Sequence, residues 1–119
     1  MTTKTTTQED FEMSRYILNI LKQQRLVVMS WGFHNPTVIS DGLQFNVQGF
    51  IHTGLVQIVY QQGLDLFMVR LLSKDFRVVK EIDRLYFDQL VEVIDENVER
   101  VKNYNERVKQ EYSNIHFYQ

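Results

Sequence analysis

The chain has 119 residues, 44% of them hydrophobic and 13% aromatic, and a formal net charge of −2. This length and apolar content suffice to bury one hydrophobic core, which excludes a wholly disordered protein. The absence of cysteine excludes disulfides, thiolate metal sites and cysteine nucleophiles. The small net charge gives no overall attraction to nucleic acid or to anionic membranes.

The first ten residues are polar, so we expect no signal peptide there. No apolar run approaches the roughly 20 residues that a membrane span needs. We therefore expect a cytoplasmic protein that does not enter a membrane. Residues 1–6, rich in threonine, are predicted to form a disordered tail. A single domain is predicted over residues 7–114, followed by a C-terminal tail over 115–119.

The first predicted element is an amphipathic helix over residues 8–24. Thr7 is its expected N-cap, and Glu9 and Asp10 fall in the first turn, where carboxylates interact favourably with the helix dipole. Apolar residues then recur every three or four positions, which predicts one buried face.

Alternation with period two follows and predicts the first strand. Val27, Met29, Trp31 and Phe33 would share one face of it. We expect this strand to end at residues 34–36, because a proline cannot donate a hydrogen bond to a sheet.

Further strands are predicted at short intervals along the chain. They are expected at residues 43–51, 56–60 and 66–72, with a short fifth strand at 76–81. Gly49 interrupts one apolar row and predicts a β-bulge, and residues 52–54 predict a hairpin loop. Since no crossover helix lies between the strands, they should form an antiparallel meander.

The last predicted element is a long helix from about Asp88 to Tyr112. Apolar residues in it are spaced alternately by four and three, which is a heptad stripe. At 1.5 Å per residue the helix would be about 37 Å long, whereas a sheet of this size is about 20–25 Å wide.

The C-terminal half of this helix therefore needs another partner, and we predict a homodimer. Alternatively, the N-terminal helix covers the stripe within one chain. The predicted dimer seam is Val98, Val101, Asn105, Val108 and Tyr112.

Together these elements predict an α+β fold of two layers. A four- or five-stranded antiparallel meander would be flanked by the N-terminal helix and the long C-terminal helix, both on one face. The predicted core is Phe11, Ile17, Leu21, Val27, Met29, Trp31, Leu43, Phe45, Val47, Val56, Ile58, Tyr60, Phe67, Val69, Leu71, Leu90 and Ile94.

No residue pattern typical of an enzyme stands out. His34, His52 and His116 belong to three separate elements and lack the spacing of metal ligands. Ser30 lacks the first glycine of a nucleophile elbow, and the five glycines are isolated, so no phosphate-binding loop is present. We predict a non-enzymatic binding or adaptor module with no cofactor and no metal.

The predicted binding surface is a row of uncharged amides on the outward strand face. It consists of Gln44, Asn46 and Gln48 on one strand and Gln57 on the next. Charged residues are depleted at the centre of protein interfaces, so this row favours contact with a partner protein.

Two other function classes remain open. A small-molecule sensor or enzyme would use a pocket rim formed by Trp31, His34 and Asn35 at a strand end. Single-stranded nucleic acid would bind the basic stretch of Arg70, Lys74, Arg77, Lys80 and Arg84.

Acidic residues interrupt that basic stretch, and an edge strand guarded by cations explains it equally well.

The chain resembles small proteins of bacterial mobile elements or phage in three segments, MSWGFHNP, FNVQGF and YFDQLVEVIDENVER. This resemblance implies neither an activity nor a site residue.

Overall fold

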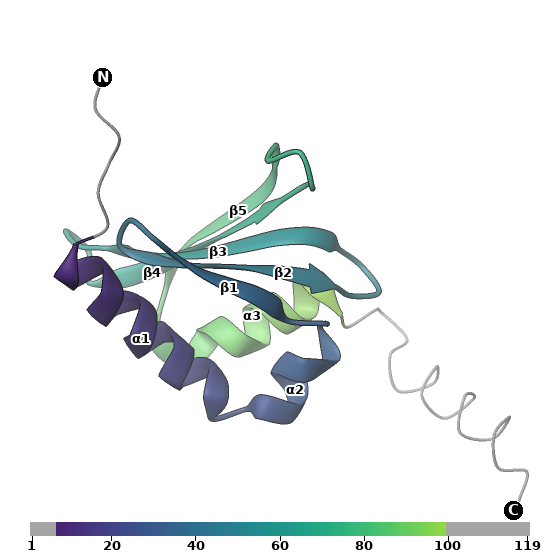
Figure 1. The fold of residues 1–119 in the computed structure, drawn as a ribbon, viewed down its shortest axis with the longest axis horizontal. Helices are drawn as coiled ribbons and strands as arrows, with labels where there is room; N and C mark the ends of the chain where they lie inside the picture. The colour runs from purple at the N-terminus through teal and green to yellow at the C-terminus, as the bar shows by residue number, and fades with distance from the viewer. Residues whose placement is uncertain (1–6, 100–119) are drawn as a thin grey trace, which may run out of the picture.

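The computed structural model describes residues 7–99, which form three α-helices, five strands and one short 3-10 helix (Figure 1). In chain order these are α1 (Gln8–Lys22), α2 (Arg25–Ser30), β1 (His34–Ile39), β2 (Gly42–Gln48), β3 (Thr53–Gln61), β4 (Leu66–Leu72), β5 (Val78–Leu85), η1 (Phe87–Gln89) and α3 (Leu90–Val98). The predicted α+β fold, with a helix at each end of an antiparallel sheet, is confirmed. Both predicted tails, at 1–6 and 115–119, lie outside the described residues.

The five strands form one sheet in the order β1-β2-β3-β4-β5, and each neighbouring pair is antiparallel. All three helices lie on one face of this sheet (Figure 1). We call the opposite, uncovered face the outer face. The hairpin between β4 and β5 bends away from the helices on that side. None of the described helices is long and apolar enough to cross a membrane.

Helix α1 begins where the sequence predicts. The Thr7 side chain accepts a hydrogen bond from the Asp10 amide at 3.1 Å, and the Asp10 carboxylate accepts from the Thr7 amide at 3.2 Å. This capping box satisfies two amides that the helix leaves unpaired. Ser14 then donates to the Gly42 carbonyl, which attaches α1 to the start of β2.

The core lies between the helices and the inner face of the sheet. All but four of the predicted core residues are buried there. Phe11 and Met29 are exposed instead, and Val27 and Tyr60 are half-buried. Phe11 misses the core because the buried face of α1 follows Ser14, Ile17 and Leu21, and Phe11 lies beside that face.

The predicted strand at 27–33 is wrong, because residues 25–30 form helix α2. Val28 and Trp31, three positions apart, point into the core, while Met29 is 65% exposed. A short apolar run fits one turn of helix as well as a strand, and packing decides between them. The first strand, β1, begins at His34 and includes Pro36, which an edge strand tolerates.

The connection between β2 and β3 also differs from its prediction. β2 ends at Gln48 and β3 begins at Thr53, so the loop is 49–52 and not 52–54. Gly49 is not a bulge; it is where the loop meets the end of α3. A Cβ atom on Gly49 would lie 2.2 Å from the Val98 carbonyl oxygen. That carbonyl accepts hydrogen bonds from the amides of Ile51 at 2.8 Å and His52 at 3.2 Å.

The fifth strand is present but lies further along the chain, at Val78–Leu85 instead of 76–81. The C-terminal helix is confirmed over Leu90–Val98, and its predicted course from residue 100 onward lies outside the described residues. Val91, Ile94 and Val98, the first part of the heptad stripe, are buried within the single chain.

Candidate binding surface on the outer face

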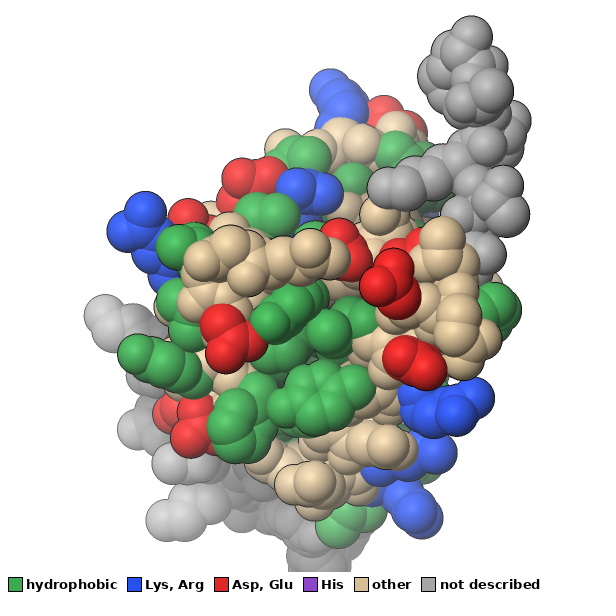
Figure 2. Space-filling view, turned by 90° about the vertical axis from the view of Figure 1, so that its left-hand side faces the viewer, with side chains coloured by type: hydrophobic (Ala, Val, Ile, Leu, Met, Phe, Trp, Pro, Cys, Tyr) green, Lys and Arg blue, Asp and Glu red, His purple; other side chains and the backbone are tan. Residues whose placement is uncertain are grey.

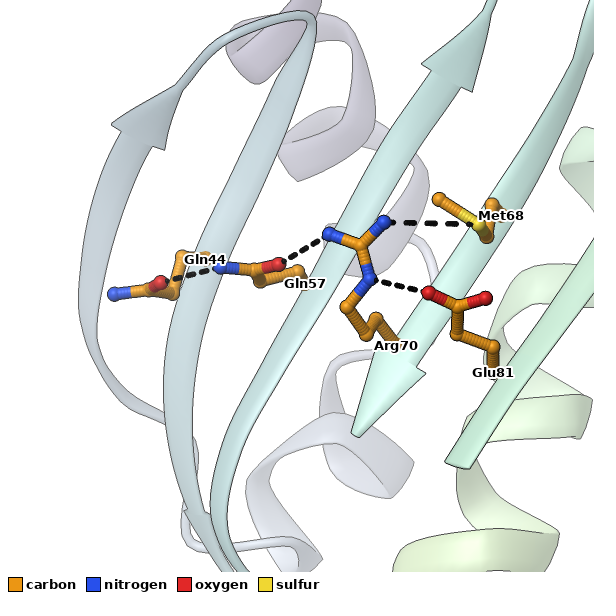
Figure 3. Close-up of polar contacts among 5 residues, drawn as sticks. All are labelled: Gln44, Gln57, Met68, Arg70 and Glu81. Carbon is orange, nitrogen blue, oxygen red and sulfur yellow. Dashed lines mark hydrogen bonds and ion pairs between the residues drawn. The ribbon is translucent and has the colours of Figure 1, made fainter. Parts of the chain in front are cut away.

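A ladder of polar side chains crosses the outer face from β2 to β5 (Figure 3). Gln44, Gln57, Arg70 and Glu81 lie directly opposite one another on four successive strands. Gln57 Nε2 donates to Gln44 Oε1 at 2.8 Å, and Arg70 Nη1 donates to Gln57 Oε1 at 3.0 Å. Arg70 Nε donates to Glu81 Oε2 at 2.8 Å. We call these four residues the amide ladder.

The amide ladder uses up much of its own hydrogen-bonding capacity. The third nitrogen of Arg70 lies 3.9 Å from the sulfur of Met68, so the guanidinium has contacts on three sides. Glu81 balances its charge through the ion pair. Of the predicted amide row, Gln57 is therefore chiefly a structural member of the ladder.

A trough of about 630 Å³ lies beside the ladder, over β1, β2 and the start of β3. It brings together Gln44, Asn46 and Gln48 of the predicted amide row with His34 and Asn35 of the predicted pocket rim. The two sets meet because β1 pairs with β2 so that His34 lies opposite Asn46. Gln57 is not among the lining residues.

Trp31 does not belong to this trough. Its side chain is fully buried in the core, and its indole Nε1 donates to Asp95 Oδ1 on α3 at 2.9 Å. The predicted pocket rim is therefore wrong for Trp31 while His34 and Asn35 do line a hollow. Trp31 instead belongs to the packing of α2 against α3.

The His34 ring is oriented by the backbone carbonyl of Gly32, two residues before it. Its Nδ1 lies 2.7 Å from the Gly32 carbonyl oxygen, which can only accept, so Nδ1 carries the proton. In the neutral ring, Nε2 is then left as an acceptor. Asn35 follows in the left-handed region, at φ 54°, a conformation that asparagine tolerates better than most residues.

The far wall of the trough comes from the β4–β5 hairpin, through Lys74 and Phe76. Lys74 makes no ion pair with any described residue. Phe76 is 62% exposed and has φ 68°, a left-handed conformation that is costly for a bulky side chain. The sequence shows both residues, but only the bend of the hairpin places them against the amide row.

The charge of the trough is one-sided. No aspartate or glutamate is present among the described residues that line it, whereas Lys74 is. Its floor includes Leu55, which is buried although it faces outward. Such a trough accepts neutral or anionic groups more readily than cationic ones.

The basic stretch does not form a single surface. Arg70 is paired with Glu81, Arg77 with Asp75 at 3.2 Å, and Arg84 with Asp83 at 4.0 Å. Lys80 lies opposite Leu71, a core residue, and donates to Asn97 of α3 at 2.7 Å. The cations therefore point to both faces of the sheet, which does not favour a phosphate-binding strip.

No group of three or more His, Asp or Glu side chains that could hold a metal ion occurs within residues 7–99. The predicted dimer seam does not hold at Val98, because its side chain is fully buried inside one chain. Val101, Asn105, Val108 and Tyr112 lie outside the described residues. The homodimer stays a prediction, which light scattering on the purified chain tests.

Comparison of the chain with protein-family models, with curated proteins and with solved structures found no match.

Proposed function

We propose that the protein is a non-catalytic binding module that holds an extended, acidic segment of a partner protein in the trough on its outer face. The observation that supports this most is the composition of the trough: amides, one lysine, one histidine and one exposed phenylalanine, with no carboxylate among the described lining residues.

The polarity of the trough favours a protein partner over a small molecule. Eight of its thirteen lining residues are exposed, and most are polar. Small-molecule sites, in contrast, are mostly apolar. A polar, open surface with little charge is typical of contacts between proteins.

Each group along the trough has a role in this proposal. Lys74, which has no ion-pair partner in the described chain, pairs with a carboxylate of the bound segment. Asn46 and Gln48 both donate and accept, as is needed to bind an extended backbone. Phe76 covers an apolar side chain. The lysine contributes chiefly to specificity, because an exposed ion pair adds little affinity.

The test is a titration of the isotope-labelled protein, followed by NMR, with three ten-residue extended peptides. They share Leu, Thr and Val and carry two Glu, two Gln or two Lys. We expect the acidic peptide to bind most tightly and to shift the signals of Asn46, Gln48 and Lys74. Equal binding of all three, or shifts confined to other faces, would contradict the proposal.

Substitutions locate the effect. Lys74→Glu is expected to abolish the preference for the acidic peptide, because it places a carboxylate in the trough. Lys80→Glu makes the same charge change outside the trough and should leave the preference intact. A thermal-shift screen with metabolites and a single-stranded oligonucleotide tests the small-molecule and nucleic-acid alternatives. A saturable shift of the melting temperature with either, without peptide binding, overturns the proposal.

A further inference from the structure

A second hollow, of about 490 Å³, lies at the end of the molecule where α1 begins and where β3 turns into β4. Figure 2 shows this end, where hydrophobic side chains gather in a depression bordered by acidic ones. We call this hollow the aromatic hollow. Its lining includes Tyr16, Tyr60, Phe67, Tyr86, Phe87 and Asp65.

The rings come from four separate parts of the fold and leave aromatic surface open to solvent. Phe67 is buried as the floor, with Tyr16 stacked on it at 6.3 Å and Tyr60 tilted against it at 5.4 Å between ring centroids. Tyr86 and Phe87 are more than half exposed. Exposed rings gathered around one hollow are uncommon unless something binds there.

The charge of the aromatic hollow is the reverse of that of the trough. Asp65 lines it and accepts a hydrogen bond from the Tyr60 hydroxyl. An adjoining hollow of about 400 Å³ shares Tyr16 and Phe87 and is lined by Asp88. No lysine, arginine or histidine lines either hollow among the described residues.

The tyrosine hydroxyl is held in its neutral form. The hydrogen bond to Asp65 raises the pKa of Tyr60 above its ordinary value, and the carboxylate charge acts in the same direction. The aromatic hollow has one carboxylate beside several aromatic rings and no positively charged side chain among the described lining residues.

We propose that the aromatic hollow binds a small quaternary ammonium compound. Ring faces carry negative electrostatic potential and attract a cation placed over them, most strongly when the cation sheds water easily. An alkylated nitrogen has no N–H group to satisfy, and its methyl groups pack on the rings. The hollow's volume and its apolar lining with few polar groups match a small-ligand site.

The experiment compares three probes of the same size class by NMR, with the ring signals of Tyr16, Tyr86 and Phe87 as the readout. The probes are choline, its neutral isostere 3,3-dimethylbutan-1-ol, and ethanolamine. Choline is expected to bind about tenfold more tightly than the isostere, since only choline carries the charge. Equal binding of choline and the isostere, or no shift with choline at tens of millimolar, overturns the proposal.

Variants distinguish binding of the cation by the rings and the carboxylate of the aromatic hollow from general apolar binding. Phe87→Leu is expected to weaken choline binding about tenfold, and Asp65→Asn about fivefold. Tyr86→Phe keeps the ring and should keep binding. Phe50→Leu changes a comparably exposed ring outside the hollow and should have no effect. If a trimethyllysine peptide binds a hundredfold more tightly than choline, the small-molecule source is wrong.

This site is independent of the trough. Its ligand is cationic, its residues are different, and the peptide titration above does not involve it. Failure of either proposal therefore leaves the other standing.

Discussion

Trp31 and Asp95 are joined by a buried hydrogen bond of 2.9 Å between residues 64 positions apart in the sequence. It connects the end of α2 to α3 beneath the sheet. We predict that Trp31→Phe destabilises the fold by about 2–4 kcal/mol, because it removes core volume and a donor to a charged group. Urea unfolding measures this.

A double-mutant cycle tests whether the bond itself matters. Trp31→Phe combined with Asp95→Leu should cost less than the sum of the single changes, because each single change already removes the hydrogen bond between the two side chains. Strict additivity would contradict a specific coupling.

Gly49 is predicted to be intolerant of any side chain. In Gly49→Ala the Cβ atom would lie 2.2 Å from the Val98 carbonyl oxygen and 2.6 Å from Val98 Cγ1, so the loop must move off the end of α3. We expect a loss of about 2–4 kcal/mol in thermal or urea unfolding. Gly63→Ala is the matched control: nothing lies within 4 Å of its Cβ, so stability should hold or rise slightly.

Phe76 offers a case in which stability and binding should move in opposite directions. Phe76→Gly relieves the left-handed backbone at φ 68° and is expected to stabilise the protein by about 1 kcal/mol. The same change removes the aromatic wall of the trough and should weaken acidic-peptide binding. Phe50→Gly, also at an exposed phenylalanine, should instead destabilise, since Phe50 does not have a positive φ. A loss of stability in Phe76→Gly would show that this ring packs in the fold.

Glu99 makes stability depend on pH. Burial raises the pKa of its carboxyl above the ordinary value of 4.5, although a hydrogen bond from the Phe50 amide opposes the shift. The folded state therefore holds the proton more tightly than the unfolded state. The stabilisation is fully present below pH 4.5 and is lost as the pH rises through the folded-state pKa.

Glu99→Gln should flatten this part of the stability–pH curve, because the amide keeps the acceptor for Phe50 but does not titrate. Glu92→Gln, at an exposed position on the same helix, is the control. Free energies of unfolding from urea titrations between pH 4 and 8 give the comparison. Parallel curves for the wild type and Glu99→Gln would rule out the effect.

The amide ladder is expected to act as one unit. Gln57→Leu removes both an acceptor for Arg70 and a donor to Gln44, and we expect a cost of about 1–3 kcal/mol. Gln62→Leu removes a single exposed bond to Asp41 and should cost much less. The difference in urea midpoint between the two variants is the measurement.

Local signals predicted the elements whose residues decide their own structure. Thr7 and Asp10 cap α1 through side chains three residues apart, and the alternation in β2 to β4 puts Phe45 and Ile58 inside. The strand prediction at residues 27–33 was wrong, because Val27, Met29 and Trp31 alternate as in a strand. Only the packing of Val28 and Trp31 against the rest of the core favours a helix.

The candidate site was predicted in part for the same reason. Asn46 and His34 each have a recognisable local pattern, but their meeting depends on the register between β1 and β2. The bend of the β4–β5 hairpin brings Lys74 and Phe76 to the trough. The aromatic hollow draws on helix α1, two strands and the connection after β5, a combination that no local pattern shows.

The clasp between loop 49–52 and the end of α3 has a consequence for synthesis on the ribosome. The Val98 carbonyl accepts from the amides of Ile51 and His52, and the Asp95 carboxylate accepts from the Trp31 indole, so both acceptors leave the ribosome well after the donors that they bind. While β1 to β5 leave the exit tunnel, the inner face of the sheet has no α3 to cover it. The growing chain must therefore expose apolar surface on the sheet until α3 has left the ribosome. During this interval a chaperone that binds exposed apolar surface has its largest target on this chain.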